Sequence, residues 1–146
     1  MPSHLAEANR AWESLLTAHT VLLREFAAEQ VWREHGVSMR EYDVLYTLAK
    51  HGSPARIGEL QRDVLLSQPA LSRLVDRLAA RGLVERAMDA GDGRAVRVRL
   101  TPEGVRLQRA VGRAHARGVA RAVGGALGAG ELAELTRLTE KLVAAR

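Results

Sequence analysis

The sequence predicts a mainly α-helical protein that contains one small β-hairpin. Three observations predict this class. Apolar residues recur every three or four positions along most of the chain, strict alternation replaces that pattern only near residues 83–100, and glycines or prolines separate the segments. A length of 146 residues fits one domain, residues 1–146, with extra helices at its ends.

The first segment predicts one long helix over residues 5–35. An apolar stripe with alternating steps of three and four runs along it: Leu5, Ala8, Trp12, Leu15, His19, Leu22 and Phe26. We expect the helix to end at Gly36, because glycine readily adopts the left-handed conformation that closes a helix.

A second, shorter helix should begin at Ser38. Ser38 and Glu41 have the spacing of a capping box, in which each residue caps the other's backbone N–H. An apolar face then follows, up to a stop at Gly52: Tyr42, Leu45, Tyr46 and Ala49.

Two further helices should form a closely connected pair. Ile57, Leu60 and Val64 mark the third helix, and a short connection leads to a fourth that begins after Ser67 and ends at Gly82. The predicted buried face of the fourth helix consists of Ala70, Leu71, Leu74, Val75 and Leu78. Its opposite face carries Gln68, Ser72, Arg73, Asp76 and Arg77.

The pattern then becomes extended. Residues 83–87 and 94–100 predict the two strands of a hairpin, because Val96, Val98 and Leu100 alternate with other residues. Thr101 should cap the next helix, which begins with Pro102. Glycines between residues 124 and 130 interrupt the helical pattern before it resumes with Leu132, Leu135, Leu138 and Leu142.

This order of elements is that of a winged helix-turn-helix, which we assign to residues 38–100. A helix enters the DNA major groove when one face packs on its scaffold and the other offers polar and cationic groups. In the fourth helix, Gln68 suits adenine, Arg73 and Arg77 suit guanine, and hydroxyl groups suit phosphates. The predicted recognition set is Ser67, Gln68, Pro69, Ser72, Arg73 and Arg77. The alternative is an ordinary amphipathic helix with a solvated face.

The hairpin adds a second candidate DNA contact, the wing. Arg94 follows a turn-rich tip and can reach a minor groove, whose narrow negative channel attracts guanidinium groups. Asp92 can orient that side chain, and Arg97 completes the predicted wing set. Taken alone, the tip also fits an exposed loop with incidental charges.

Composition narrows the function classes. The net charge of +5 suits a polyanionic partner. The absence of cysteine excludes disulfides, thiolate metal sites and cysteine nucleophiles. We find no catalytic motif and no His-x-x-x-His pair, so we expect neither an enzyme, nor a cofactor, nor a metal site. We also find no membrane-spanning run and no signal peptide, which predicts a cytoplasmic protein.

Several blocks together resemble the MarR family of bacterial transcription factors, without a gap from about residue 37 to 107. They lie at residues 57–60 (IGEL), 67–78 (SQPALSRLVDRL), 81–86 (RGLVER), 92–96 (DGRAV) and 100–104 (LTPEG). The resemblance implies a homodimer with residues 1–36 and 102–146 as dimerisation helices, recognition by the fourth helix and a wing arginine at Arg94. One departure is Gly93, where many members carry a second basic residue.

The resemblance also implies a pocket for small aromatic or phenolic effectors, with Trp12, His19, Trp32, Tyr42 and Tyr46 as candidate lining residues. Each of these also fits plain core packing. We therefore expect a homodimeric regulator, a repressor in this interpretation, that recognises a pseudo-palindromic operator in duplex DNA. A winged-helix module that binds protein and a metal-responsive regulator are the alternatives.

The last third of the chain carries an arginine series at helical spacing: Arg106, Arg109, Arg113, Arg117 and Arg121. A solvated stripe, or one paired with the acidic first helix across an interface, is the favoured interpretation. A second DNA-binding surface is the other.

Overall fold

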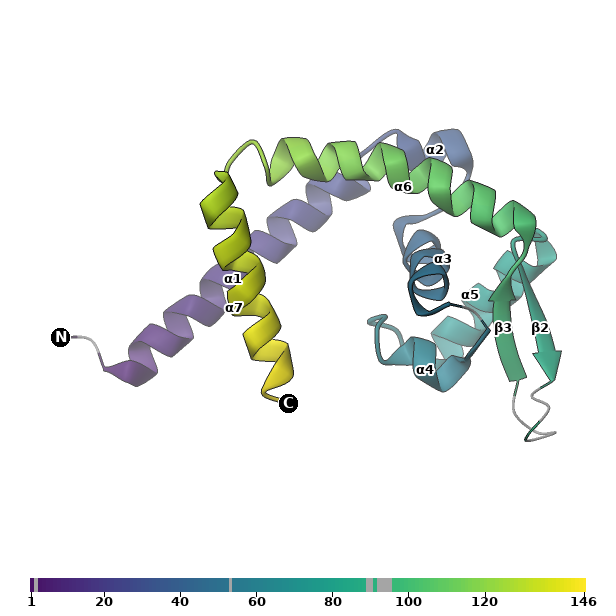
Figure 1. The fold of residues 1–146 in the computed structure, drawn as a ribbon, viewed down its shortest axis with the longest axis horizontal. Helices are drawn as coiled ribbons and strands as arrows, with labels where there is room; N and C mark the ends of the chain where they lie inside the picture. Colours follow the sequence, from purple (N-terminus) through teal and green to yellow (C-terminus); the bar gives the residue numbers. More distant parts are fainter. Residues whose placement is uncertain (2, 53, 89–90, 92–95) are drawn as a thin grey trace. The chain divides into compact units, whose positions relative to one another are not determined.

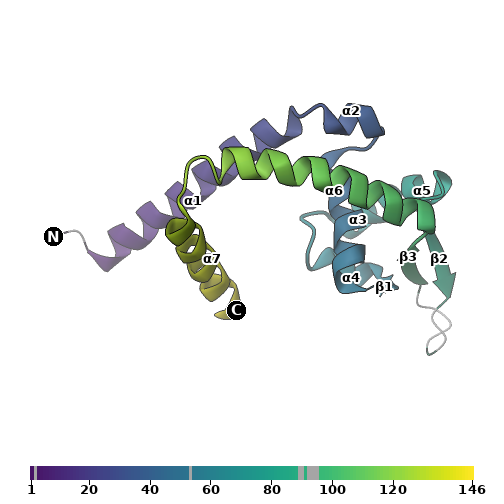
Figure 2. The same ribbon diagram turned by 45° about the horizontal axis from the view of Figure 1, so that its top comes forward.

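The computed structural model describes residues 1, 3–52, 54–88, 91 and 96–146, and it divides into two compact units. Residues 30–114 form the first, here called the winged unit. Residues 1–29 and 115–146 form the second, here called the terminal unit. Figures 1 and 2 show the helices and strands of both units.

The helices of the winged unit are α2 (Val31–His35), α3 (Met39–His51), α4 (Ile57–Gln61), α5 (Gln68–Ala80) and the first part of α6 (Pro102–Ala122). Local capping signals predict both ends of α3 and the start of α5, but the start of α2 was not predicted, and α4 ends at Gln61, before the predicted helix member Val64. The predicted capping box is confirmed: Ser38 Oγ accepts from the Glu41 N–H at 3.0 Å, and the Ser38 N–H donates to Glu41 Oε1 at 3.3 Å. Gly36 and Gly52 end their helices with φ of 64° and 67°.

The sheet of the winged unit has three antiparallel strands in the order β1-β3-β2. The predicted hairpin is confirmed as β2 (Val84–Met88) and β3 (Val96–Leu100). A third strand, β1 (Ala55–Arg56), pairs with β3 and was not predicted. Two residues are too few to show the alternation that identifies a strand in a sequence, so only the pairing with β3 reveals β1.

The main core lies where α3, α4 and α5 meet the sheet. The predicted buried face of α5 is confirmed at Leu71, Leu74, Val75 and Leu78, whereas Ala70 is only half-buried. The buried members of this core are Val44, Leu45, Leu48, Ala55, Leu60, Val64, Leu71, Leu74, Val75, Leu78, Leu83, Val84 and Val98. Burial of this face holds α5 in one orientation, which exposes its other face.

The predicted buried face of α3 is partly wrong. Tyr42 and Leu45 are buried, but Tyr46 is 47% exposed and Ala49 is also exposed. The main core instead takes Val44 and Leu48, which share the same four-residue spacing. Spacing alone cannot choose between two apolar arcs of one helix, and here packing against α4 and the sheet chooses.

The predicted long first helix is also wrong, because it divides into α1 (His4–Ala27) and the short α2. Val31 and Trp32 are buried in a second core of the winged unit, together with Val37, Tyr42 and Val111. Neither residue continues the α1 stripe, whose last member is Phe26. A straight helix would therefore carry them on a different face, and the chain turns at residues 28–30 instead.

The terminal unit contains α1, the end of α6 and α7 (Ala129–Ala144). Glu29 Oε2 lies 3.4 Å from His115 Nδ1, and Phe26 meets the His115 ring edge-to-face at 5.2 Å between centroids. A Cβ atom on Gly118 would lie 2.1 Å from Glu29 Oε1, so this glycine makes room for the carboxylate. The segment after α1 is thereby held against α6.

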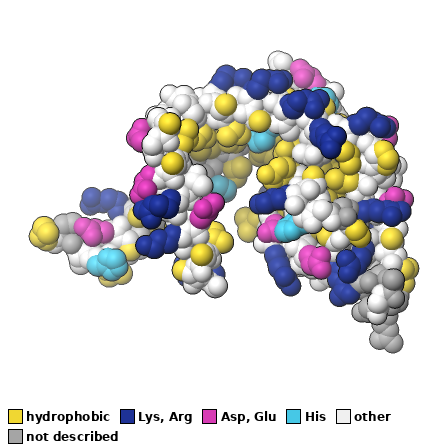
Figure 3. Space-filling model, viewed as in Figure 1, with side chains coloured by type: hydrophobic (Ala, Val, Ile, Leu, Met, Phe, Trp, Pro, Cys, Tyr) yellow, Lys and Arg dark blue, Asp and Glu magenta, His cyan; other side chains and the backbone are white. Residues whose placement is uncertain are grey.

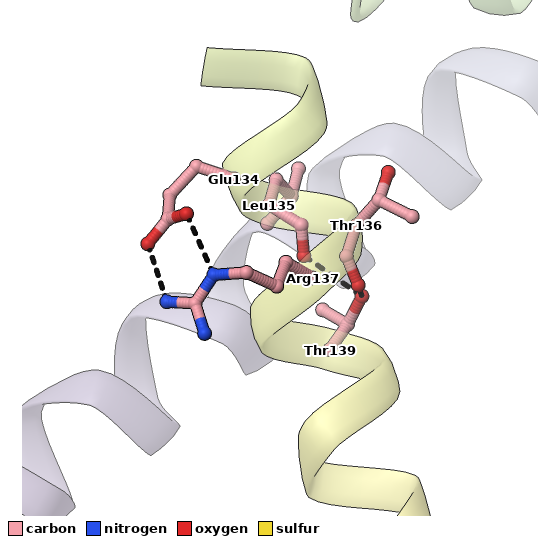
Figure 4. A network of polar contacts seen from close by, with 5 residues as sticks. All are labelled: Glu134, Leu135, Thr136, Arg137 and Thr139. Carbon is pink, nitrogen blue, oxygen red and sulfur yellow. Dashed lines mark hydrogen bonds and ion pairs between the residues drawn. The ribbon is translucent and has the colours of Figure 1, made fainter. Parts of the chain in front are cut away.

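The polar residues of α7 interact with one another, whereas its apolar residues lack a covering layer. Arg137 donates to both carboxylate oxygens of Glu134, at 2.9 and 2.7 Å, and the Thr139 hydroxyl donates to the Leu135 carbonyl at 2.9 Å (Figure 4). Neither α1 nor α7 contains a buried residue. Among the described residues, no helix has both the length and the apolar character needed to cross a membrane.

Candidate nucleic-acid interface

The exposed face of α5 carries the predicted recognition residues. Ser67 Oγ accepts from the Ala70 N–H at 3.3 Å and so caps the helix, as predicted. Gln68, Pro69, Arg73 and Arg77 are exposed, and Ser72 is half-buried. The structure therefore brings the six predicted residues together at the start and along one side of a single helix.

Arg73 and Arg77 are free to meet a ligand. Neither guanidinium forms an ion pair or hydrogen bond with another described residue. They lie four residues apart, one turn along the same side of α5. Two long cations in this arrangement suit the guanine edges and phosphates of a major groove.

Arg86, which the sequence analysis did not identify, supports this face from β2. Its Nη1 lies 2.9 Å from Asp76 Oδ1, and its Nη2 donates to the Ser72 carbonyl at 3.3 Å. The pairing offsets the one carboxylate on the exposed face of α5, which would otherwise repel phosphates. No sequence signal identifies this contact, because it joins a strand to a helix fourteen residues away through tertiary packing.

The connection from α4 to α5 is short and is tied to α3. The Leu66 N–H donates to the Val64 carbonyl at 2.9 Å, which tightens the turn before α5. His51, the last residue of α3, pairs with Asp63 beside this turn. These contacts give the two helices the fixed relation that a helix-turn-helix requires.

The predicted wing set is only partly covered by the described residues. Asp92 and Arg94 lie outside them. Arg97 lies on β3 opposite Ala87 and is half-buried, and its neighbour Arg99 donates through Nε to Glu85 Oε1 at 2.9 Å. Among the described residues of the hairpin, β3 therefore adds Arg97 and Arg99 to the Arg86 of β2.

The predicted effector residues fall into two groups. In the winged unit, the Tyr42 ring lies 5.8 Å from Trp32 and 6.0 Å from Tyr46, between centroids. Burial raises the pKa of the Tyr42 phenol above its ordinary 10.0, while a hydrogen bond from Gln108 acts in the opposite direction. Trp12 and His19 belong to α1 in the terminal unit and are exposed, Trp12 by 59%.

The arginine series of α6 lies largely in solvent. Arg106 pairs with Glu103 on its own helix, and Arg109, Arg113, Arg117 and Arg121 are exposed. Figure 3 shows Lys and Arg side chains following α6 along one side. Among the described residues, no group of three or more acidic, histidine or cysteine side chains is placed to hold a metal ion.

Comparison with known proteins agrees with this geometry. A sequence profile described as the MarR family matches residues 35–95. The chain is 34% identical, over 88 residues, to the HTH-type transcriptional regulator PecS of Dickeya dadantii. That match covers 59% of this chain and 53% of PecS, so it spans about half the length of the curated relative.

Solved structures share the whole fold. Sco3205 of Streptomyces coelicolor, a MarR family transcriptional regulator in complex with DNA, matches with a TM-score of 0.81 at 28% identity, over 99% of this chain and 91% of that one. PcaV, a transcriptional regulator of the same organism in complex with its natural ligand, matches with a TM-score of 0.68 at 23% identity, over 99% and 97%. At 23% identity, the likeness to PcaV concerns the fold alone.

Proposed function

We propose that this chain, which matches the MarR family of transcriptional regulators over residues 35–95, is a homodimeric member of that family that binds duplex DNA sequence-specifically through α5. One observation carries the proposal. Arg73 and Arg77 are exposed on α5 and form no ion pair with another described residue, and they lie directly opposite a face that is buried in the main core. A helix held in this way can enter a major groove without rearrangement of its scaffold.

Each predicted residue has a role in this proposal. Gln68 bonds an adenine edge, Arg73 and Arg77 bond guanines, and Ser67 and Ser72 bond phosphates beside Pro69. The wing adds Arg94, oriented by Asp92, in the adjacent minor groove, with Arg97 at its base. Arg86 acts as a positioning residue, because it pairs with Asp76 and bonds Ser72.

The dimer is supported by the uncovered apolar residues of α1 and α7. Large side chains in these two helices are exposed by 37–74%: Leu5, Trp12, Leu15, Leu16, Val21, Leu23, Leu135, Leu138, Leu142 and Val143. A second copy that covers them removes this apolar surface from water. We assign dimerisation to residues 1–36 and 102–146, and DNA binding to residues 38–100.

Symmetry of the dimer determines the operator. Two copies of α5 related by a two-fold axis require a pseudo-palindrome with half-sites roughly 10 bp apart. Light scattering after gel filtration measures the mass of the species in solution, and footprinting locates the half-sites. A monomer under native conditions contradicts this part of the proposal.

The regulator acts as a repressor in the bacterial cytoplasm and responds to a small aromatic or phenolic effector. The proposed effector residues are Trp12 and His19 in the terminal unit and Tyr42 and Tyr46 in the winged unit, and an effector acts through different affinities for DNA-competent and DNA-incompetent states. The complex of PcaV with its natural ligand supports a search for such a compound.

The decisive experiment selects bound fragments from a random duplex pool and then measures affinity against salt. We expect log K to fall with log salt by about 0.9 for each phosphate neutralised. Arg73→Ala or Arg77→Ala should cost about 1–3 kcal/mol on the selected site, if that residue contacts a base. Arg40→Ala on α3 removes the same charge outside α5 and outside the segments assigned to dimerisation, and it serves as the control.

Three outcomes distinguish the alternatives. A flat salt response favours a winged-helix module that binds protein. If Arg73→Ala and Arg77→Ala lower the affinity equally for every DNA sequence, the two arginines contact phosphates and not bases. A loss of affinity with Arg40→Ala as large as with Arg73→Ala shows that only net charge matters, which contradicts recognition by α5.

A further inference from the structure

A cavity of about 450 Å³ lies within the winged unit, at the junction of α3, β3 and α6. It is lined by the last turn of α3, the segment that follows it, the end of β3 and the first turns of α6. Figure 2 shows these elements. The volume falls in the range of small-molecule sites, roughly 300–1,000 Å³.

This cavity is open to solvent, and aliphatic side chains share its lining with polar and charged groups. Leu48 is fully buried, Leu100 and Val105 are half-buried, and Pro54 lines the cavity beside them. Among the described residues that line it, none is aromatic. A ligand is therefore held by contact with its hydrocarbon surface and not by ring stacking.

Two cations accompany this aliphatic lining. Arg109 is exposed and forms no ion pair with another described residue. Arg99 is bonded through its Nε to Glu85, which holds the guanidinium in one place and offsets its charge. Arg109 is thus the uncompensated charge of the site, and a carboxylate is the group that a guanidinium binds through two parallel hydrogen bonds.

We propose that this cavity binds an aliphatic monocarboxylate, with its chain against Pro54, Leu100 and Val105 and its carboxylate on Arg109. The site is separate from the aromatic residues proposed for the effector, since none of Trp12, His19, Tyr42 and Tyr46 lines it. It also requires no DNA, so it stands or falls independently of the DNA-binding proposal.

Gln108 connects the cavity to the second core. Its side chain lines the cavity and hydrogen-bonds to Tyr42, whose ring packs against Trp32. A carboxylate that draws the amide toward Arg109 changes the surroundings of Tyr42 and Trp32. Trp32 is 7% exposed, so its fluorescence reports on that change.

The test is calorimetric titration of the full-length, DNA-free protein with octanoate, 1-octanol and benzoate. Octanoate should bind at least about tenfold more tightly than 1-octanol, because a hydrogen bond to a charged group is stronger than a neutral one. Arg109→Ala should weaken octanoate binding about tenfold or more, and Arg109→Lys should weaken it less. Octanoate should also shift the tryptophan emission of the Trp12→Phe protein, in which Trp32 is the remaining indole.

Arg113→Ala is the matched control. Arg113 follows Arg109 by one turn of α6, is also exposed and does not line the cavity. Its loss should leave octanoate affinity unchanged. An independent variant, Ala49→Leu, adds bulk to the cavity wall and should abolish binding without lowering Tm, because Ala49 is exposed.

Four results overturn the proposal. They are equal affinity for octanoate and 1-octanol, equal losses in Arg109→Ala and Arg113→Ala, tighter binding of benzoate than of octanoate, and unchanged octanoate binding in Ala49→Leu. The first two contradict recognition of the carboxylate by Arg109. The third contradicts an aliphatic ligand, and the fourth contradicts the placement of the ligand in this cavity.

Discussion

Gly104→Ala tests whether the start of α6 is held against the wing by close backbone contact. A Cβ atom at residue 104 would lie 1.9 Å from the Leu83 carbonyl oxygen, whereas an ordinary C···O contact is about 3.3 Å or more. The carbonyl cannot easily move away, because it accepts a hydrogen bond from the Thr101 N–H at 3.1 Å. The Thr101 hydroxyl also donates to the Gly82 carbonyl at 2.6 Å. Residues on both sides of the contact are therefore tied together.

The expected magnitude follows from two opposing effects. Alanine in place of glycine within a helix stabilises by about 0.5–1 kcal/mol, and forced overpacking costs about 1–3 kcal/mol or more. We expect Gly104→Ala to lose about 1–2 kcal/mol of unfolding free energy, which lowers Tm by about 2–8 °C for a chain of this length. Thermal unfolding is followed by circular dichroism at one fixed protein concentration, because the proposed dimerisation would make Tm depend on concentration.

Gly58→Ala is the matched control, because Gly58 is the second residue of α4 and an added Cβ there meets nothing within 4 Å. It should raise stability by up to about 1 kcal/mol. The reasoning is refuted if Gly104→Ala is as stable as the wild type or shifts Tm in the same direction as Gly58→Ala.

Three other predictions follow from burial and charge. Leu71→Ala should cost about 2–5 kcal/mol of unfolding free energy, because the Leu71 side chain of α5 is fully buried in the main core, whereas Leu65→Ala should cost almost nothing because Leu65 is 97% exposed; chemical unfolding measures both, and similar losses contradict the core assignment. Burial raises the pKa of Tyr42, so the folded state holds that proton above the ordinary value of 10.0. The contribution of the protonated Tyr42 to the free energy of unfolding is therefore fully present below pH 10.0 and is lost as pH rises through the pKa of the folded state. The difference between the absorbance titrations of the wild type and Tyr42→Phe should show a phenol that ionises above pH 10. A midpoint at or below pH 10 contradicts the raised pKa. The Arg137 guanidinium lowers the pKa of the Glu134 carboxyl, but both groups are exposed, so Arg137→Ala should return that pKa toward its ordinary value in an NMR titration without a measurable change in Tm.

Capping and periodicity made much of the winged unit predictable. Ser38 with Glu41, and Ser67 before α5, are local signals whose hydrogen bonds form within four residues, so they require no tertiary information. The buried face of α5 was predictable for a similar reason, since only one of its faces is apolar. The polar residues of the candidate interface followed directly, because they occupy the opposite side of the same helix.

The errors occurred where two arrangements satisfied the same local pattern. Val44 and Leu48 share the spacing of Tyr42 and Tyr46, and packing against α4 and the sheet decided which pair the main core takes. The cavity between α3, β3 and α6 and the Arg86–Asp76 pair were equally unpredictable, because each joins segments that are distant in the sequence. Spacing in one helix carries no information about a partner that another segment supplies.

By itself, the sequence determined the order of the longer helices and the hairpin, the caps of α3 and α5 and the exposed arginines of α5, because these depend on hydrogen bonds and periodicity within single segments. Only the tertiary structure decided that the first helix breaks after Ala27, that β1 joins the sheet and that Arg86 pairs with Asp76. Those features minimise the free energy of several segments packed together, so no single segment contains the signal for them.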